Sequence, residues 1–296
     1  MAVEIAEPER TPLAVAARRG AGGARAGGIG LAALLALCAG MVLAFLALPI
    51  VALFAEIPLG SVPGLLADPV VLSALEVTVK TNAIANVLIL ALGTPLAYLL
   101  ATKRFVGRPL VVTLVELPLV LPPAVAGIGM LAAFGAGGLF GDDLQHAGIV
   151  LPFSQWAVVL AVTFVASPFY IRQAITAFEA VDPTLTDAAR TLGAGPGRTF
   201  WRVSLPLASA GLIAGWVLAF ARGVGEFGAT IVFAGNVHGS TQTLTLAVYE
   251  QLDRNFDIAL AIGILLVLLS AAVLLSYKLL VSWKDSTSPS PVRLVG

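Results

Sequence analysis

Residues 179–206 read EAVDPTLTDAARTLGAGPGRTFWRVSLP and form a polar interruption in an otherwise apolar chain. Asp182 is a favoured helix N-cap residue, and Pro183 suits the first helical position because its missing N–H is not needed there. Gly193 follows about ten residues later and is typical of a helix end. The stretch therefore predicts one short helix.

This short helix carries a small apolar face. Its members fall at positions i, i+3, i+4 and i+7, namely Leu185, Ala188, Ala189 and Leu192. Such a face fits a shallow groove. Beyond the helix, Gly195, Pro196 and Gly197 predict a turn, and Pro206 opens the next hydrophobic run.

The composition places the rest of the chain in a membrane. Hydrophobic residues make up 58% and charged residues 11% of its 296 residues, and the mean hydropathy is +0.97. These values exclude a soluble globular protein. The sequence predicts an all-α membrane protein with six transmembrane helices, each long enough to cross: residues 29–54, 74–101, 110–134, 155–178, 207–233 and 256–281.

The ends of the chain and its loops bound these spans. Residues 1–28 and 282–296 are predicted to be solvated tails, and residues 74–281 a core that contains spans two to six. The first apolar run is too long for the hydrophobic region of a signal peptide, so we expect an uncleaved span. The single cysteine, Cys38, excludes an intramolecular disulfide, and no Cys/His cluster indicates a metal site.

The basic residues predict the orientation. Retained cytoplasmic loops are enriched in Lys and Arg, and one orientation assigns most of them to a single side: Arg10, Arg18, Arg19, Arg25, Lys103, Arg104, Arg108, Arg172, Arg190, Arg198, Arg202, Lys278, Lys284 and Arg293. The external loops 55–73, 135–154 and 234–255 then retain only Arg254. Both termini and the polar stretch should therefore face the cytoplasm.

Two spans contain unusual residues. The third carries Pro118, Pro122 and Pro123, which remove backbone donors and bend a helix. The segment should therefore face the protein interior or a pathway. The alternative is that the prolines only introduce a structural kink. In the fifth, Arg222 and Glu226 can pair on one helical face, either for packing or for a substrate. Its glycines, Gly223, Gly225 and Gly228, favour close approach to a neighbouring helix or a second copy.

The spacing within residues 179–206 resembles the EAA loop of bacterial ABC importer permeases, EAA-x3-G-x9-I-x-LP. Every interval of this motif matches, and its positions are occupied by Asp187, Ala188, Ala189, Gly193, Val203, Leu205 and Pro206. Asp187 stands where the family has Glu, and Val203 where it has Ile. The resemblance implies a coupling helix that docks, with Leu192, into a separate ATP-binding subunit. The alternative is an amphipathic cytoplasmic linker.

Two further motifs resemble the molybdate permease branch of the molybdate/sulfate importer family. They are ELPLVLPP at residues 116–123 and GEFGAT-x2-FAGN at residues 225–236. The resemblance implies the type I ABC importer permease fold. The translocation path or the dimer interface should then include Pro122, Pro123, Arg222, Glu226 and Thr230. Of the other intramembrane cations, Lys80 should be neutralised by Glu76 one turn earlier.

The same resemblance implies an assembly in a bacterial inner membrane. Its expected parts are a homodimer of permease subunits, two cytoplasmic ABC ATPase subunits and an extracytoplasmic molybdate-binding protein. ATP and Mg would be bound by the ATPase, and no cofactor by this chain, which lacks a phosphate-binding Walker A motif. We expect a non-catalytic subunit and no nucleic-acid partner.

Alternative functions remain at this point. The oxyanion could be sulfate, thiosulfate or tungstate, and a passive anion channel would need no ATPase. An intramembrane enzyme is disfavoured because no Gly-x-Ser-x-Gly, paired aspartate or His-Glu-x-x-His motif occurs in the spans.

Overall fold

The computed structural model describes residues 13–287, and all regular structure within that range is helical. The helices are α1 to α13, with one π-helical turn, η1. This confirms the all-α prediction. The chain divides into two units, residues 1–56 and 57–296.

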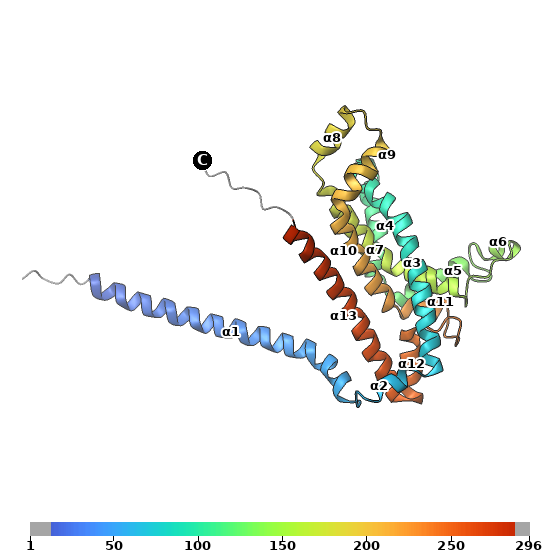
Figure 1. Ribbon diagram of the computed structural model, residues 1–296, viewed down its shortest axis with the longest axis horizontal. Helices are drawn as coiled ribbons and strands as arrows, with labels where there is room; N and C mark the ends of the chain where they lie inside the picture. Colours follow the sequence, from blue (N-terminus) through green and yellow to red (C-terminus); the bar gives the residue numbers. More distant parts are fainter. Residues whose placement is uncertain (1–12, 288–296) are drawn as a thin grey trace, which may run out of the picture. The chain divides into compact units, whose positions relative to one another are not determined.

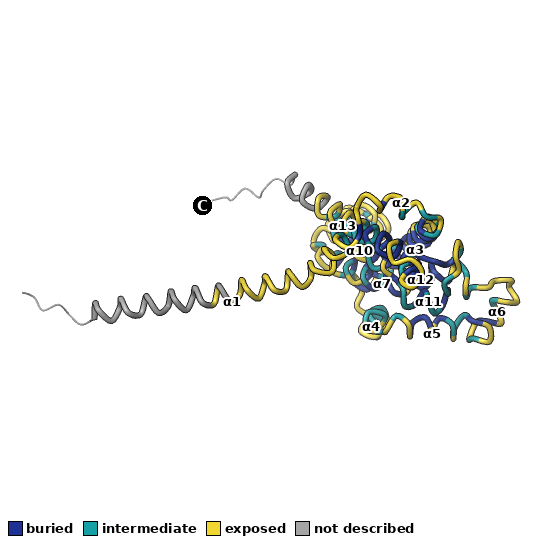
Figure 2. The backbone as a smooth tube through the Cα atoms, turned by 90° about the horizontal axis from the view of Figure 1, so that it is seen from below, coloured by how far each residue is buried: buried dark blue, intermediate teal, exposed yellow. Residues whose placement is uncertain are grey.

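The first unit contains a single long helix, α1 (Leu13–Ala55). Its segment Leu34–Ala55 is long and apolar enough to cross a membrane, in agreement with the predicted span 29–54. Most of its described side chains are exposed (Figure 2), so this apolar surface needs lipid or protein against it. Of the predicted tail 1–28, the residues from Leu13 onward belong to α1 and the rest lie outside the described residues, so its place as a solvated tail stays a prediction.

Three long helices form the core of the second unit (Figure 1): α3 (Pro69–Thr102), α7 (Gln155–Glu179) and α10 (Leu205–Val224). Helix α7 packs against both of the others. Small residues permit the close approach, because a Cβ added at Gly211 of α10 would lie 2.5 Å from the Cβ of Ala177. Such contacts are the usual way in which helices associate in lipid, where burial of apolar surface contributes little.

Helices α2 (Val62–Leu66), α12 (Leu244–Arg254) and α13 (Phe256–Thr287) pack at one end of this core. Their apolar cluster with α3 contains Val71, Ala74, Leu244, Ala247, Ile258 and Ile262. All three predicted external loops contain a short helix: α2 lies in residues 55–73, α6 (Gly141–His146) in residues 135–154 and α12 in residues 234–255. The predicted tail 282–296 begins inside α13 and otherwise lies outside the described residues.

The third predicted span is not one kinked helix but two. Helix α4 (Arg108–Val120) ends at Leu121, and α5 (Pro123–Phe134) starts in a direction that differs by 116°. Pro118 is accommodated inside α4, whereas Pro122 and Pro123 occupy the N-cap and the first position of α5. Neither proline can continue the hydrogen-bond ladder of α4, which accounts for the position of the break.

The fifth predicted span, residues 207–233, also needs correction. Helix α10 ends at Val224, and α11 (Gly228–Phe233) follows after a three-residue break. Helix α11 packs on α5, where a Cβ added at Gly127 would lie 2.9 Å from the carbonyl oxygen of Ala229. The two broken spans therefore meet each other.

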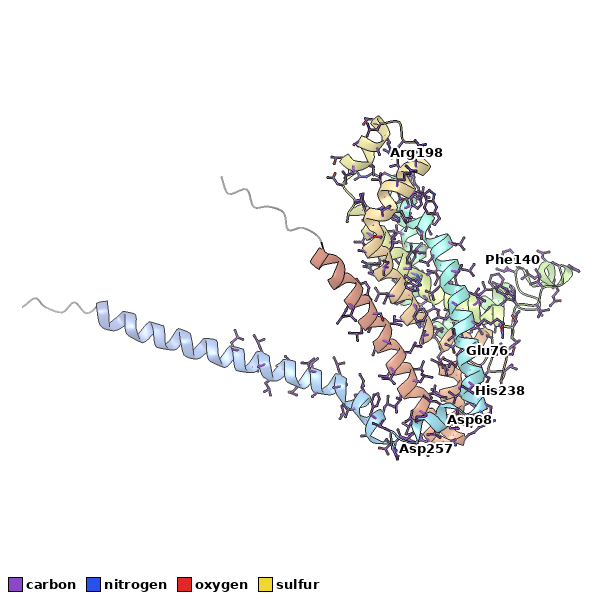
Figure 3. The ribbon with its side chains drawn as sticks, in the orientation of Figure 1. Asp68, Glu76, Phe140, Arg198, His238 and Asp257 are labelled. Carbon is purple, nitrogen blue, oxygen red and sulfur yellow. The ribbon has the colours of Figure 1, made fainter. Side chains whose placement is uncertain are left out.

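The described chain contains five helices that are long and apolar enough to cross a membrane, or six if the bent pair α4–α5 forms one crossing. This agrees with the predicted number of spans. The second unit has two distinct ends (Figure 3). Arg198 marks the end that carries α8, called the α8 end below, and Asp68, His238 and Asp257 lie at the opposite end.

Candidate functional site

Helix α8 (Pro183–Thr191) is the predicted short helix, and its boundaries follow from local chemistry. The carboxylate of Asp182 accepts hydrogen bonds from the backbone N–H of Thr184 at 2.9 Å and from its hydroxyl at 2.8 Å. These bonds lower the pKa of Asp182 below its ordinary value. Gly193 ends the helix with a φ of +83°, a conformation that only glycine adopts at little cost. The predicted N-cap and C-terminal glycine are confirmed.

No residue of α8 is buried within the chain. Leu185 is 47% exposed and Leu192 is 88% exposed, although both belong to the predicted apolar face. Asp187 forms an ion pair with Arg190 at 3.2 Å on the same exposed helix. The helix therefore keeps both leucines of its apolar face and its charged pair largely exposed within the described chain.

The segment that returns from α8 to the bundle is held firmly. Helix α9 (Pro196–Thr199) leads into η1 (Phe200–Ser204), and the side chains of Thr199 and Ser204 are buried. The ring of Phe200 packs edge-on against Tyr98 of α3, with centroids 4.8 Å apart. Among the remaining predicted loop residues, Val203 and Leu205 are half-buried and Pro206 is exposed.

A polar strut fixes the helices beneath α8. The guanidinium of Arg108, at the start of α4, donates to the carbonyl oxygen of Leu100 at 2.8 Å. It also forms an ion pair with Glu179 at the end of α7, at 2.7 Å. One side chain therefore links the ends of α3, α4 and α7 next to α8.

The two helix breaks bring the other predicted site residues together. A Cβ added at Gly228 would lie 2.8 Å from the Cβ of Pro123 and 3.2 Å from the backbone nitrogen of Ala124. The start of α11 therefore covers the start of α5. This contact places Pro122 and Pro123 beside the segment that carries Glu226 and Thr230, although the two segments lie far apart in the sequence.

Glu226 is buried in the break between α10 and α11. One carboxylate oxygen lies 2.8 Å from Nη2 of Arg222, and the other accepts a hydrogen bond from the backbone N–H of Ala229 at 2.7 Å. The backbone carbonyl of Glu226 accepts from the hydroxyl of Thr245 at 2.7 Å. The predicted pair forms, although Glu226 lies beyond the end of the helix that carries Arg222.

Thr230 lies in α11 and is fully buried. Its hydroxyl donates to the carbonyl oxygen of Phe227 at 2.8 Å, so its one donor hydrogen is used within the chain. The role of Pro122, Pro123, Arg222, Glu226 and Thr230 in a translocation path or dimer interface stays a prediction.

The sequence interpretation missed a row of buried polar residues on α3. Thr78, Asn82 and Asn86 recur every four residues, so they share one face of the helix. The hydroxyl of Thr78 accepts from the backbone N–H of Leu244, and a Cβ added at Gly223 would lie 2.5 Å from Oδ1 of Asn82. Their regular spacing in an apolar span was the signal that could have revealed this row.

The expectation for Lys80 is wrong in one respect. Lys80 and Glu76 are both exposed, and no ion pair joins them in the described part of the chain.

Among the described residues, no group of His, Cys, Asp and Glu side chains is arranged to hold a metal ion.

Comparison with solved structures agrees with this fold. A chain in the crystal structure of a bacterial alginate ABC transporter, in complex with an alginate-bound periplasmic protein, superposes with a TM-score of 0.69 at 17% identity. The match covers 83% of this chain and 92% of that one. Likeness at this level of identity concerns the fold alone, which is that of a type I ABC importer permease.

Comparison with characterised proteins gives closer relatives. The chain is 45% identical to the molybdenum transport system permease protein ModB of Mycobacterium tuberculosis over 233 residues, 78% of this chain and 88% of that protein. It is 42% identical to ModB of Escherichia coli K12 over 177 residues, 60% and 77% of the two chains. The sulfate transport system permease protein CysT of Synechococcus elongatus is 34% identical over 242 residues, 80% and 87% of the two chains.

The family comparison covers most of the second unit. Residues 93–285 match the binding-protein-dependent transport system inner membrane component, a match that includes α8, both helix breaks and most of the long helices. The extent of this match and the 45% identity to a permease together define the family. This chain belongs to the family of inner membrane components of binding-protein-dependent transport systems.

Proposed function

We propose that this chain is the membrane-spanning permease subunit of an ATP-driven importer that carries molybdate into the cytoplasm. The observation that supports the coupling role is α8 itself, an exposed helix whose sequence has the spacing of the EAA loop. The molybdate assignment is supported by 45% and 42% identity to two molybdenum permeases, against 34% to a sulfate permease. Sulfate, thiosulfate and tungstate remain the alternative substrates.

The proposed assembly contains two copies of this chain, two ATPase subunits that bind ATP and Mg, and an external molybdate-binding protein. This chain itself would bind no cofactor and catalyse no reaction. The excess of basic residues near α8 supports an inner-membrane orientation with both termini and α8 in the cytoplasm.

In this mechanism, the ATPase pair moves the α8 helices of the two permeases. A displacement of α8 would reach the long helices through α9 and η1, whose Phe200 packs against Tyr98 of α3. Two rigid bodies that rock about a central site provide alternating access. Molybdate is the transported substrate, and we propose that its tight selection belongs to the external binding protein.

Replacement of Gly193 tests the coupling role. In Gly193→Val, a β-branched residue is forced into the left-handed region, so the end of α8 is distorted although no atom lies within 4 Å of the added Cβ. We expect ATP hydrolysis to continue with little molybdate uptake. The matched control is Gly197→Val, which also enters open space but at an ordinary helical φ. Equal uptake by both variants at equal expression would contradict the coupling role.

Competition uptake tests the substrate. Cells that carry the whole system are given labelled molybdate and challenged with tungstate or sulfate. We expect sulfate to compete poorly, because the chain is more similar to molybdenum permeases than to the sulfate permease. Efficient competition by sulfate would support the alternative substrate.

A further inference from the structure

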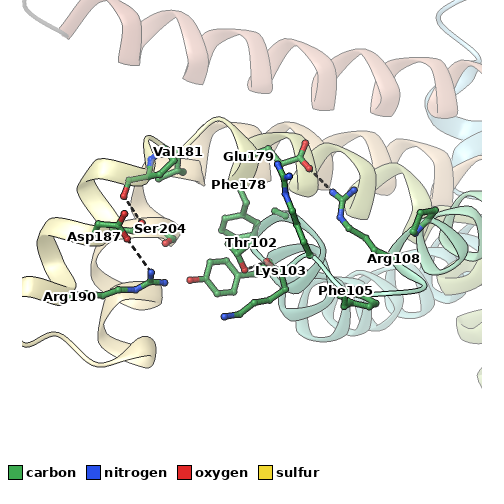
Figure 4. A pocket seen from close by; sticks show the side chains of 16 residues that line it. Thr102, Lys103, Phe105, Arg108, Phe178, Glu179, Val181, Asp187, Arg190 and Ser204 are labelled. Atoms are coloured by element: carbon green, nitrogen blue, oxygen red, sulfur yellow. Dashed lines mark hydrogen bonds and ion pairs between the residues drawn. The ribbon is translucent and has the colours of Figure 1, made fainter.

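A large cavity lies at the α8 end, on the side of α8 that faces the ends of α3 and α4. Its volume is about 700 Å³, and it lies between the end of α3, the start of α4 and α8 (Figure 4). Sites of roughly 300–1,000 Å³ hold ligands of some tens of atoms. The cavity is therefore much larger than a single oxyanion requires.

The charges around this cavity are unbalanced. Arg108 is paired with Glu179, and Arg190 is paired with Asp187. Lys103 and Arg104 also line the cavity, and neither has a carboxylate partner in the described part of the chain. The lining thus carries a net charge of +2, because four cations face two carboxylates.

The positions of the cations favour an anion between them. In Figure 4, Lys103 from the end of α3 and Arg190 from α8 point into the cavity from facing sides. The hydroxyls of Thr102 and Thr186 in the lining already donate to the backbone carbonyls of Tyr98 and Pro183, so the cations are the groups left to hold an anion. Cations that face one another repel unless an anion lies between them.

The surroundings indicate that the cavity lies at the boundary between membrane and water. The apolar run of α3 ends at Ala101, directly before Thr102, Lys103 and Arg104. Tyr98, which lines the cavity, packs against the rings of Phe178 and Phe200. A group of aromatic residues beside a group of basic residues is typical of the membrane interface.

Apolar side chains beside the cavity point out of the protein. In the α3–α4 loop and the start of α4, Phe105 is 40% exposed, Val106 is fully exposed and Leu110 is 64% exposed. Such residues are unfavourable in water and stable against acyl chains. An occupant with a charged head and an apolar body matches both parts of this surface.

We propose that this cavity binds the headgroup of an anionic phospholipid such as phosphatidylglycerol. The lipid phosphate lies between Lys103, Arg104 and Arg190, and the acyl chains run past Phe105 and Leu110. Basic pockets between transmembrane helices at a membrane surface bind anionic headgroups in this way. Occupancy would neutralise the excess charge beneath α8 and thereby stabilise the base from which the helix extends.

Lipid binding by the full chain, without its ATPase, tests this proposal. The protein in neutral detergent is titrated with phosphatidylglycerol or with phosphatidylcholine, and bound lipid is counted by native mass spectrometry. We expect Lys103→Gln/Arg104→Gln to bind phosphatidylglycerol roughly 30-fold more weakly, about fivefold for each charge near an anionic surface. The charge-preserving Lys103→Arg/Arg104→Lys should retain wild-type affinity, which separates lost charge from misfolding.

A matched control removes two cations at the same end that do not line the cavity. Arg198→Gln/Arg202→Gln should leave the affinity for phosphatidylglycerol unchanged. An equal loss in both double variants, or no preference for phosphatidylglycerol in the wild type, would overturn the proposal. Displacement of the lipid by inorganic phosphate would show a free anion site instead.

A last measurement separates the lipid from a protein partner. If Lys103→Gln/Arg104→Gln keeps its lipid affinity but no longer co-purifies with an ATPase subunit, the cavity holds a partner segment and the lipid proposal is wrong. If lipid affinity falls while co-purification from phosphatidylglycerol-free detergent persists, the lipid proposal is supported.

Discussion

Helix α8 and the break between α10 and α11 are both short departures from the long helices, but they are held in opposite ways. Asp182 and Gly193 define α8 through contacts within a few residues, and none of its own residues is buried. The break depends on Glu226, which contacts Arg222, Ala229 and Thr245, and on Gly228, which packs on α5. Substitutions in α8 should therefore alter partner binding, and substitutions in the break should alter stability.

The largest effect is expected for Glu226→Ala. Removal of one partner leaves the half-buried guanidinium of Arg222 without its counter-charge, which costs about 3–5 kcal/mol in comparable buried pairs. The backbone N–H of Ala229 also loses its acceptor. Thermal unfolding in detergent, followed by intrinsic fluorescence, should show a strongly lowered midpoint.

A double substitution separates packing from function at this pair. In Arg222→Met/Glu226→Gln the charges are removed together, and the glutamine oxygen can still accept from Ala229. Most of the lost stability should return. If this stable variant then transports molybdate normally, the pair serves packing alone, and neither residue belongs to the predicted translocation path.

A smaller loss of stability is expected for Gly228→Ala. The added methyl group would meet Pro123 at 2.8 Å and the backbone of α5 at 3.2 Å, and overpacking of this kind costs about 1–3 kcal/mol. Gly225→Ala is the matched control, since its nearest contact would be at 3.8 Å. Equal unfolding midpoints for the two variants would show that α5 and α11 move apart easily.

The N-cap of α8 should give a local and pH-dependent effect. Hydrogen bonds from Thr184 lower the pKa of Asp182, so the cap stabilises α8 above the ordinary pKa and is lost as the pH falls through the lowered one. The intrinsic exchange rate itself falls with pH, so the quantity to compare is the protection factor, which should decrease at residues 183–191 at acid pH. Asp182→Asn should remove this pH dependence, because an asparagine oxygen caps the helix without titrating. Identical pH profiles would exclude Asp182 as the cause.

The smallest effect on stability is expected for Leu192→Ala. Leu192 is 88% exposed, and changes at such positions usually alter stability by less than about 0.5 kcal/mol. Co-purification of an ATPase subunit should nevertheless fall, because the predicted apolar face loses its more exposed leucine. Leu139→Ala is the control, an equally exposed leucine between α5 and α6. Unchanged co-purification would show that Leu192 does not contribute to the contact between α8 and the ATPase subunit.

The same contrast explains what the sequence could reveal. Helix α8 was predicted with its cap and its final glycine because both signals are local. The prolines of the third span predicted a bend, but its 116° angle depends on the packing of α5 against α11. The end of α10 at Val224 was missed, because residues 207–233 are apolar enough for one continuous span. Only tertiary contacts, such as that between Thr245 and Glu226, show that this span is broken.

The π-helical turn η1 has a consequence for the direction in which α8 extends. A π turn accommodates one more residue than an α turn, and one residue corresponds to about 100° of rotation around a helix axis. With η1 in place, Phe200 packs into the aromatic group while Trp201 lies 68% exposed. A deletion that restored regular α-helical winding at residues 200–204 would swing α8 and α9 by about a quarter turn relative to α10. The extra residue in η1 therefore determines the direction in which α8 projects from the helix bundle.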